Sequence, residues 1–92
     1  MPKLYKFGRY SIFFWSNENN EPIHVHVCEG NAAANATKIW LTSRGGCIVA
    51  HNKSRIPNSD LLEITETVKT NFFFICNEWK KHFNVASIIF YA

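Results

Sequence analysis

The spacing of apolar residues changes at Pro57, and this change constrains the fold more than any other feature of the chain. Before Pro57, apolar residues tend to alternate with other side chains, which is typical of β-strands. After Pro57 they recur at steps of three and four, which places them along one face of a helix. The residues of this stripe are Leu61, Ile64, Val68, Phe72, Ile75, Cys76, Trp79 and Phe83. The stripe predicts a single helix of about 24 residues.

Polar side chains mark both ends of this predicted helix. Asn58, Ser59 and Asp60 are good N-cap residues, and Asp60 with Glu63 imitates a capping box. The basic run at residues 80–82 complements the negative end of the helix dipole. The sequence therefore predicts where the helix begins and ends as well as which face it buries.

About five segments before Pro57 have the composition and spacing of strands. They are residues 4–7, 10–15, 23–28, 36–41 and 47–51. Connections this short allow only antiparallel neighbours, so the sheet is expected to be a meander. A chain of 92 residues can hold one core, which makes residues 1–92 a single domain. The predicted fold is an α+β two-layer sandwich, in which the helix covers one face of the sheet and leaves the other uncovered.

His24 and His26 stand two positions apart in the third predicted strand. Successive side chains of a strand point to opposite faces, so the two imidazoles share the face that Val25 and Val27 do not. There they could share a metal ion, act as an acid and base pair, or bind phosphate. They could also be ordinary half-exposed sheet residues. His24 and His26 are therefore the candidate catalytic residues.

A metal ion would need a third ligand beside these two histidines. Cys28, Glu29 and His51 are the nearby candidates, and none of them completes a recognised ligand spacing. The three cysteines are an odd number and fit reduced, mostly buried thiols. The sequence predicts no metal site and no cofactor.

Lys38 and Trp40 share one side of the fourth predicted strand, and they adjoin the histidines if the third and fourth strands pair. An aromatic ring beside cationic side chains suits stacked bases and a phosphate backbone. The net charge of +3 permits RNA binding without requiring it, because basic and acidic groups alternate along the chain. Trp40 could instead belong to a second small core beneath a dimer partner.

Phe74 lies away from the apolar stripe of the predicted helix, so it should be exposed unless another segment or subunit covers it. Residues 85–92 are too apolar to remain in water, and we expect them to add a strand or to cross to a partner chain. Phe74, Phe90 and Tyr91 are therefore the candidate interface of a homodimer.

No apolar run approaches the roughly 20 residues of a membrane-spanning helix. The first residues also lack the hydrophobic region of a signal peptide. The sequence predicts a cytoplasmic protein without membrane contact.

Three stretches of the chain, residues 13–27, 36–41 and 78–83, resemble one known family. The first contains a Ser-Asn-Glu loop that leads into the pattern Pro-x-His-Val-His-Val. These stretches resemble DUF4160, a family of small bacterial proteins of unknown function, over nearly the whole chain. Many members have a second proline before the first histidine, where this chain has Ile23, which makes the loop exit less rigid. Glu18 and Asn19 of this loop join Lys38 and Trp40 as candidate binding residues.

The resemblance implies association with a second uncharacterised family, DUF2442, in arrangements reminiscent of toxin–antitoxin modules. We therefore predict a small cytosolic binding module that contacts RNA or a partner protein through the sheet face of His24 and His26. One alternative is a metal-independent ribonuclease in which these histidines are acid and base. Another is a homo-oligomeric interaction protein with no catalytic role.

Overall fold

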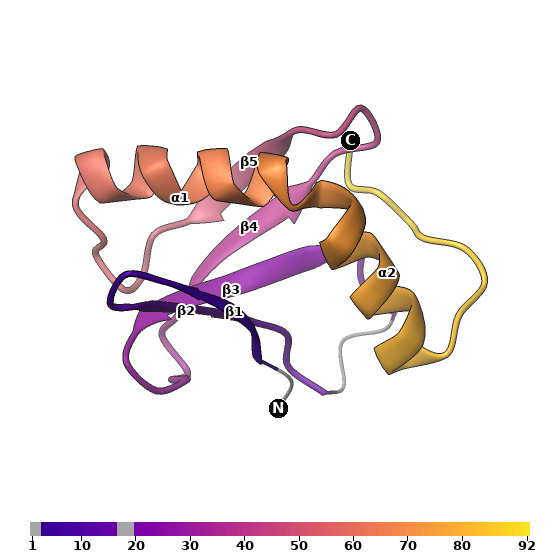
Figure 1. Ribbon diagram of the computed structural model, residues 1–92, viewed down its shortest axis with the longest axis horizontal. Coiled ribbons are helices and arrows are strands. Elements are labelled where there is room, and N and C mark those ends of the chain that lie inside the picture. Colours follow the sequence, from indigo (N-terminus) through magenta and orange to yellow (C-terminus); the bar gives the residue numbers. More distant parts are fainter. Residues whose placement is uncertain (1–2, 17–19) are drawn as a thin grey trace.

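The computed structural model describes residues 3–16 and 20–92, and it has a five-stranded antiparallel sheet followed by two helices (Figure 1). The strands lie in chain order across the sheet, from β1 to β5. The elements are β1 (Lys3–Phe7), β2 (Tyr10–Phe13), β3 (His24–Glu29), β4 (Thr37–Leu41), β5 (Cys47–His51), α1 (Asn58–Thr70) and α2 (Phe72–Phe83). The predicted α+β class and the predicted meander are confirmed.

The main core lies between one face of the sheet and the two helices. Val25 and Val27 of β3 point into this core and are fully buried, as the alternation of the strand predicts. Other fully or almost fully buried members are Ile12, Phe14, Ile39, Leu41, Ile64, Val68, Ile75 and Trp79. The residues predicted to form the helix stripe and the inner strand face therefore meet in one layer.

The helical segment breaks at Asn71, so it forms two helices where the apolar spacing predicted one. The Thr70 hydroxyl donates to the carbonyl of Glu66, and the Asn71 amide donates to the carbonyl of Thr67, both at 2.9 Å. Side chains that compete for main-chain carbonyls in this way weaken a helix. Asn71 has φ −98° and ψ 19°, and the chain changes direction there (Figure 1). As a result α2 turns away from α1 and covers the end of the sheet where β3 begins.

The start of α1 is not held by the predicted cap. The helix begins at Asn58, directly after Pro57, and among the described residues no side chain caps its first turn. Asp60 instead accepts hydrogen bonds from the Tyr10 hydroxyl at 2.6 Å and from the Arg9 guanidinium at 3.1 Å. The carboxylate therefore ties α1 to the turn between β1 and β2 rather than completing a capping box.

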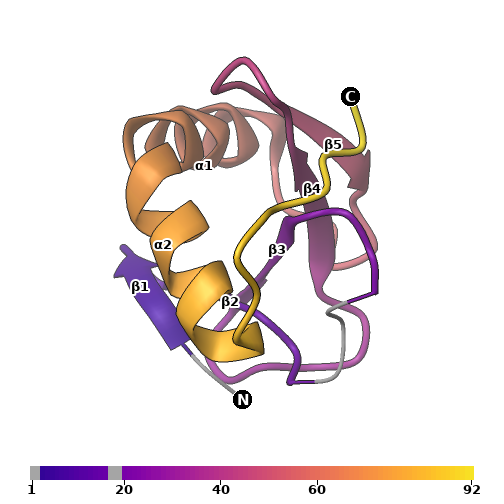
Figure 2. The ribbon, with the colours of Figure 1, turned by 90° about the vertical axis from the view of Figure 1, so that its right-hand side faces the viewer.

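Residues 85–92 return along α2 and pass the start of β3 on their way to the turn between β4 and β5 (Figure 2). The N–H of Ile23 donates to the carbonyl of Ile89 at 2.8 Å, and the N–H of Ser43 donates to the carbonyl of Ala92 at 2.9 Å. This segment does not form the expected extra strand. The expected crossing to a partner chain stays a prediction. The segment packs on its own chain because the open side of α2 gives its apolar residues a surface to cover.

Candidate functional site

The structure places His24 and His26 side by side on the sheet face opposite the main core, with 4.9 Å between their ring centroids. The expectation that this face is open is wrong for both residues. His24 is 0% exposed and His26 is 7% exposed. Their predicted acid and base roles remain a prediction, and a substrate could reach the two rings only if the segments covering them moved.

His26 belongs to a small second core on this face of the sheet. Its ring stacks on Phe13, with 5.6 Å between centroids and 27° between ring planes. Trp15, from the segment after β2, lies 6.1 Å from His26 and 5.1 Å from Phe13. Phe13 also packs with Cys28 and Ala36, which are both buried. The second core fixes His26 within an apolar surrounding.

His24 lies where the two cores meet at the end of the sheet. Its ring is 5.5 Å from Trp40 on its own face and 5.5 Å from Trp79 of α2, measured between centroids. Its Nδ1 lies 2.8 Å from the carbonyl oxygen of Pro22. Since a carbonyl oxygen can only accept, Nδ1–H is the donor of this hydrogen bond. The hydrogen bond and the three neighbouring rings orient His24 from several sides.

β3 and β4 pair as predicted, so Trp40 lies opposite His24 and Lys38 lies opposite His26. The Lys38 ammonium is 4.2 Å from the centroid of a Trp40 ring and 2.7 Å from a carboxylate oxygen of Glu21. Tyr91 stacks on Trp40 at 4.8 Å with only 4° between the planes. The Trp40 ring, which was expected to stack on bases, is thus already covered in part by Tyr91 of the same chain. The binding roles of Lys38 and Trp40 remain predictions.

The pairing of Glu21 with Lys38 gives a pH-dependent contribution to stability. The hydrogen bond from Lys38 lowers the pKa of the Glu21 carboxyl, and the nearby positive charges act in the same direction. A carboxyl group whose pKa is lower in the folded chain than in the unfolded chain stabilises the fold when it is ionised. This stability is fully present at pH values above the ordinary glutamate pKa of about 4.3, and it is lost as the pH falls through the folded-state pKa. We expect Glu21→Gln to reduce the free energy of unfolding by about 0.5 kcal/mol at pH 7, because solvent screens this partly exposed pair.

Urea unfolding at pH 7 and pH 3 measures this effect. The difference between the wild-type chain and Glu21→Gln should be smaller at pH 3 than at pH 7, because the Glu21 carboxylate becomes protonated as the pH falls through its lowered folded-state pKa. The exposed Glu63 provides the matched control, and Glu63→Gln should change little at either pH. An equal cost of Glu21→Gln at both pH values would show that the carboxylate charge contributes nothing.

The structure also shows how the possible metal ligands and the three cysteines are arranged. Within residues 3–16 and 20–92, no three His, Cys, Asp or Glu side chains are grouped closely enough to hold a metal ion. The Cys28 thiol donates to the carbonyl of Asn31 at 3.1 Å. Burial raises the pKa values of Cys47 and Cys76, which favours protonated thiols. All three cysteines are free.

The remaining candidate residues are not brought together in one place. Glu18 and Asn19 lie outside the described residues. Phe74 is partly exposed on α2, as expected, whereas Phe90 stacks on Phe72 of its own chain with 12° between the ring planes. Tyr91 is 59% exposed although it stacks on Trp40. Two of the three predicted interface residues therefore pack within the chain.

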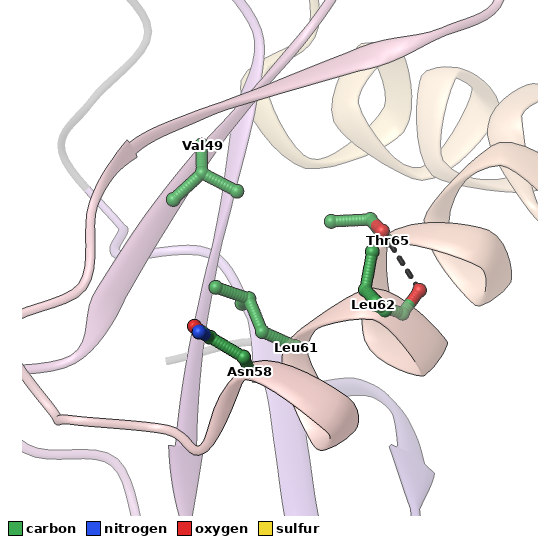
Figure 3. Close-up of a pocket in the computed structure, with 5 residues that line it drawn as sticks. All are labelled: Val49, Asn58, Leu61, Leu62 and Thr65. Carbon is green, nitrogen blue, oxygen red and sulfur yellow. Dashed lines mark hydrogen bonds between the residues drawn. The ribbon is translucent and has the colours of Figure 1, made fainter.

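Sequence reasoning missed a groove between the sheet edge and α1, which we name the β5 groove (Figure 3). Its volume is about 300 Å³, and its lining residues are Val49, Asn58, Leu61, Leu62 and Thr65. Figure 3 shows Val49 of β5 facing Leu61 across this groove. Leu62 is 69% exposed, and its place outside the helix stripe is the sequence signal that could have indicated this surface.

A second groove, which we name the α2 groove, runs between α2 and the C-terminal segment. Its volume is about 290 Å³, and it is lined by Phe72, Phe73, Cys76, Asn77, Lys80, Ile88 and Phe90. Phe73, like Leu62, lies outside the predicted stripe. Apolar residues off the stripe were therefore the available signal for both grooves.

Neither helix of the described residues has the length and apolar character needed to cross a membrane.

The comparisons with known proteins agree with the resemblance found in the sequence. No curated protein and no solved structure matches the chain significantly. The family model described as "Domain of unknown function (DUF4160)" matches residues 10–80, which include β2 to β5, α1 and most of α2. The chain therefore belongs to the DUF4160 family.

Proposed function

We propose that this DUF4160 protein is a protein-binding module that takes an extended segment of a partner protein as a sixth strand along β5. The observation that carries the proposal is an uncharged edge strand beside an apolar groove. Strand addition of this kind uses main-chain hydrogen bonds for affinity and pockets for alternate side chains for specificity.

The two edges of the sheet differ in their protection against pairing. β1 carries Lys3 and Lys6, and its register shifts between Lys3 and Tyr5, so it has two of the devices that block an edge. β5 has the sequence Cys-Ile-Val-Ala-His and no lysine, arginine or carboxylate. Burial lowers the pKa of His51, which favours its neutral form at pH 7. β5 is thus the edge better suited to pairing with another strand.

The β5 groove supplies the side-chain pocket that an added strand would use. A strand next to β5 would direct every second side chain toward the helix side, where Val49, Leu61 and Leu62 lie. The register irregularity of β5 falls near its His51 end, so its first residues pair regularly with β4. An apolar side chain of the partner would bury the exposed Leu62 and fill the groove.

Charge indicates which kind of segment fits. Residues 42–59 contain Arg44, Lys53 and Arg55, all exposed, and no acidic residue. An antiparallel pair of two β5 strands would bring Arg44 of each copy near Lys53 and Arg55 of the other, which is unfavourable. The expected occupant is therefore a different protein, with an apolar centre and acidic residues on both flanks.

The earlier expectation of a partner on the His24 and His26 face has less support, because both rings are buried. We place the role in bacteria, as the family resemblance implies, and in the cytosol, as the sequence analysis predicts. A DUF2442 protein in a toxin–antitoxin-like pair is the first partner to test. RNA bound on the histidine face is the second candidate, supported by the exposed ring of Tyr91 on Trp40.

The test uses a nine-residue peptide with the centre Val-Ile-Val and Asp and Glu flanks, titrated into ¹⁵N-labelled full-length chain. We expect saturable amide shifts at Cys47–His51 and Leu62. A peptide with the same centre and Lys flanks should bind at least tenfold more weakly. Leu62→Glu should weaken binding of the acidic peptide at least tenfold. Phe73→Glu, also at an exposed apolar position, should bind the acidic peptide with the affinity of the wild-type chain.

Equal binding of the two peptides, or no saturable shift at β5 up to millimolar concentration, would overturn the proposal. Single-stranded RNA in the same titration distinguishes the second candidate. The histidine face would be favoured by two results together. RNA would produce saturable amide shifts at His24, His26 and Tyr91, and the peptide would leave the amide signals of β5 unchanged.

A further inference from the structure

The C-terminal segment, residues 85–92, is held to the rest of the chain by few main-chain contacts. Beyond Val85 it makes two main-chain hydrogen bonds to the other described residues, through the carbonyls of Ile89 and Ala92. The side chains of Ile89 and Tyr91 are 63% and 59% exposed. A segment with few main-chain hydrogen bonds and exposed side chains opens at a much lower free energy than the whole domain unfolds.

The side chains of this segment nevertheless fill specific places on the chain. Phe90 stacks on Phe72 with 12° between the ring planes, and Tyr91 stacks on Trp40 with 4°. Ile88 and Phe90 also pack against the main core. Opening the segment exposes these apolar surfaces to water, which is unfavourable. The open chain is therefore stable only if the same places are filled again.

The turn that folds the segment back is strained at Asn84. Figure 2 shows the segment, in yellow, leaving the end of α2 and doubling back. Asn84 has φ 53° and ψ 50°, in the left-handed region. Glycine adopts this conformation freely, whereas residues with a side chain are disfavoured there, asparagine less than most. An extended or helical Asn84 releases the strain and directs the segment away from its own chain.

We infer that two copies of this chain exchange their C-terminal segments, with Asn84 as the hinge. In the exchanged dimer, Phe90 of each copy stacks on Phe72 of the other, and Tyr91 of each copy stacks on Trp40 of the other. Exchange of an identical element requires no new complementary surface, because every contact is one that the closed chain already makes. The uncovered surface is thus filled by the segment that the structure already places on it.

The exchange goes beyond the proposed strand addition and does not compete with it, because no residue of the C-terminal segment lines the β5 groove. It gives a specific form to the crossing expected from the sequence. Phe90 and Tyr91 contact the other copy, whereas Phe74 is not among the exchanged residues. The aromatic pair at Trp40 is then completed by a residue of the other copy.

The closed chain holds its segment by a short tether, so the exchange depends on chain concentration. A short linker gives its own segment an effective concentration on the order of 1 mM, and relaxation of the two hinges favours the dimer. Sedimentation equilibrium of the full-length chain measures this competition, with the 10.6 kDa chain mass as the monomer reference. We expect a monomer at about 10 µM and a monomer–dimer equilibrium at about 1 mM.

Variants of the hinge test the strain directly. Asn84→Ala should lower the dissociation constant at least tenfold, because alanine is less tolerated in the left-handed region and the dimer relaxes two hinges. Asn84→Gly should raise it at least fivefold, because glycine adopts the closed turn freely. Asn77→Ala makes the same substitution at an exposed position within α2 and should change it less than twofold. Circular dichroism confirms that each variant is folded.

Exchange also predicts that a residue in the exchanged contact has little influence on the dimer. Tyr91→Ala removes the same contact with Trp40 from the closed and from the exchanged chain, so the dissociation constant should stay within threefold of the wild-type value. A dimer joined through the exposed faces of Tyr91 would instead be weakened at least tenfold, and that result would contradict the exchange.

Isotope-filtered NMR identifies the exchange itself. Equal amounts of ¹³C-labelled and unlabelled full-length chain are unfolded together in urea and refolded at about 1 mM, the concentration at which the tethered segment is matched. We expect a nuclear Overhauser effect between the Tyr91 ring of one copy and the Trp40 ring of the other. A dimer without this signal overturns the inference. So does a monomer at that concentration in both the wild-type and the Asn84→Ala chain, or a dimer that both Asn84 variants leave within twofold of the wild-type dissociation constant.

Discussion

Trp79→Ala is expected to lower the free energy of unfolding by about 3–5 kcal/mol, the usual range for removing a large buried aromatic side chain. Trp79 is the point at which α2 joins the main core. Its ring packs against Phe14 at 5.0 Å, Phe83 at 4.4 Å and His24 at 5.5 Å, measured between centroids. Truncation removes all three contacts and leaves a cavity that the surrounding rings cannot fill without moving.

This loss is large for a domain of this size, whose total stability is on the order of 5–14 kcal/mol. Urea unfolding followed by far-UV circular dichroism measures it without depending on the fluorescence of the residue removed. Trp79→Phe keeps part of the ring and should cost clearly less. A loss below about 1 kcal/mol for Trp79→Ala would contradict the packing of α2 on this core.

His24→Ala is expected to lower the free energy of unfolding by about 2–4 kcal/mol, combining the loss of a buried ring with the loss of one hydrogen bond. The ring touches His26, Trp40 and Trp79, and its Nδ1–H donates to the carbonyl of Pro22. A histidine that served only as an acid or base on an open surface could be removed with little effect on stability. The same experiment therefore distinguishes a structural role from a purely catalytic one.

His24→Asn provides an intermediate case, because the amide can still donate near the position of Nδ1 while the ring contacts are lost. We expect about half of the alanine effect, again from urea unfolding. His82 is exposed, and His82→Ala controls for the general loss of an imidazole with an expected change within about 0.5 kcal/mol. If His24→Ala were as stable as His82→Ala, the burial described here would not contribute to the fold.

The fold class could be predicted because it depends on periodicities that the sequence displays directly. Val25 and Val27 alternate with the histidines, and the stripe from Leu61 to Phe83 keeps its three- and four-residue steps. The break at Asn71 could not be predicted from the same stripe, because the apolar steps continue across it. It depends on the side chains of Thr70 and Asn71 binding main-chain carbonyls.

The candidate site was predicted only in part. Strand pairing alone placed Lys38 and Trp40 opposite the histidines, so that neighbourhood followed from the pattern. Burial of the rings did not follow, because it depends on contacts distant in sequence, such as Trp15 with His26 and Trp79 with His24. The sequence placed Trp15 at the end of a strand over residues 10–15, whereas β2 ends at Phe13, and that assignment gave no sign that Trp15 packs beside His26.

The position of His24 at the end of the sheet has a consequence for how the chain unfolds. A thin sheet with an apolar layer on each face could lose one layer while keeping the other. Here the His24 ring contacts Trp40 and His26 on one side and Trp79 on the other, so neither layer can come apart without exposing a shared side chain. The two layers are thereby coupled into a single cooperative unit, in which disturbing either layer weakens both.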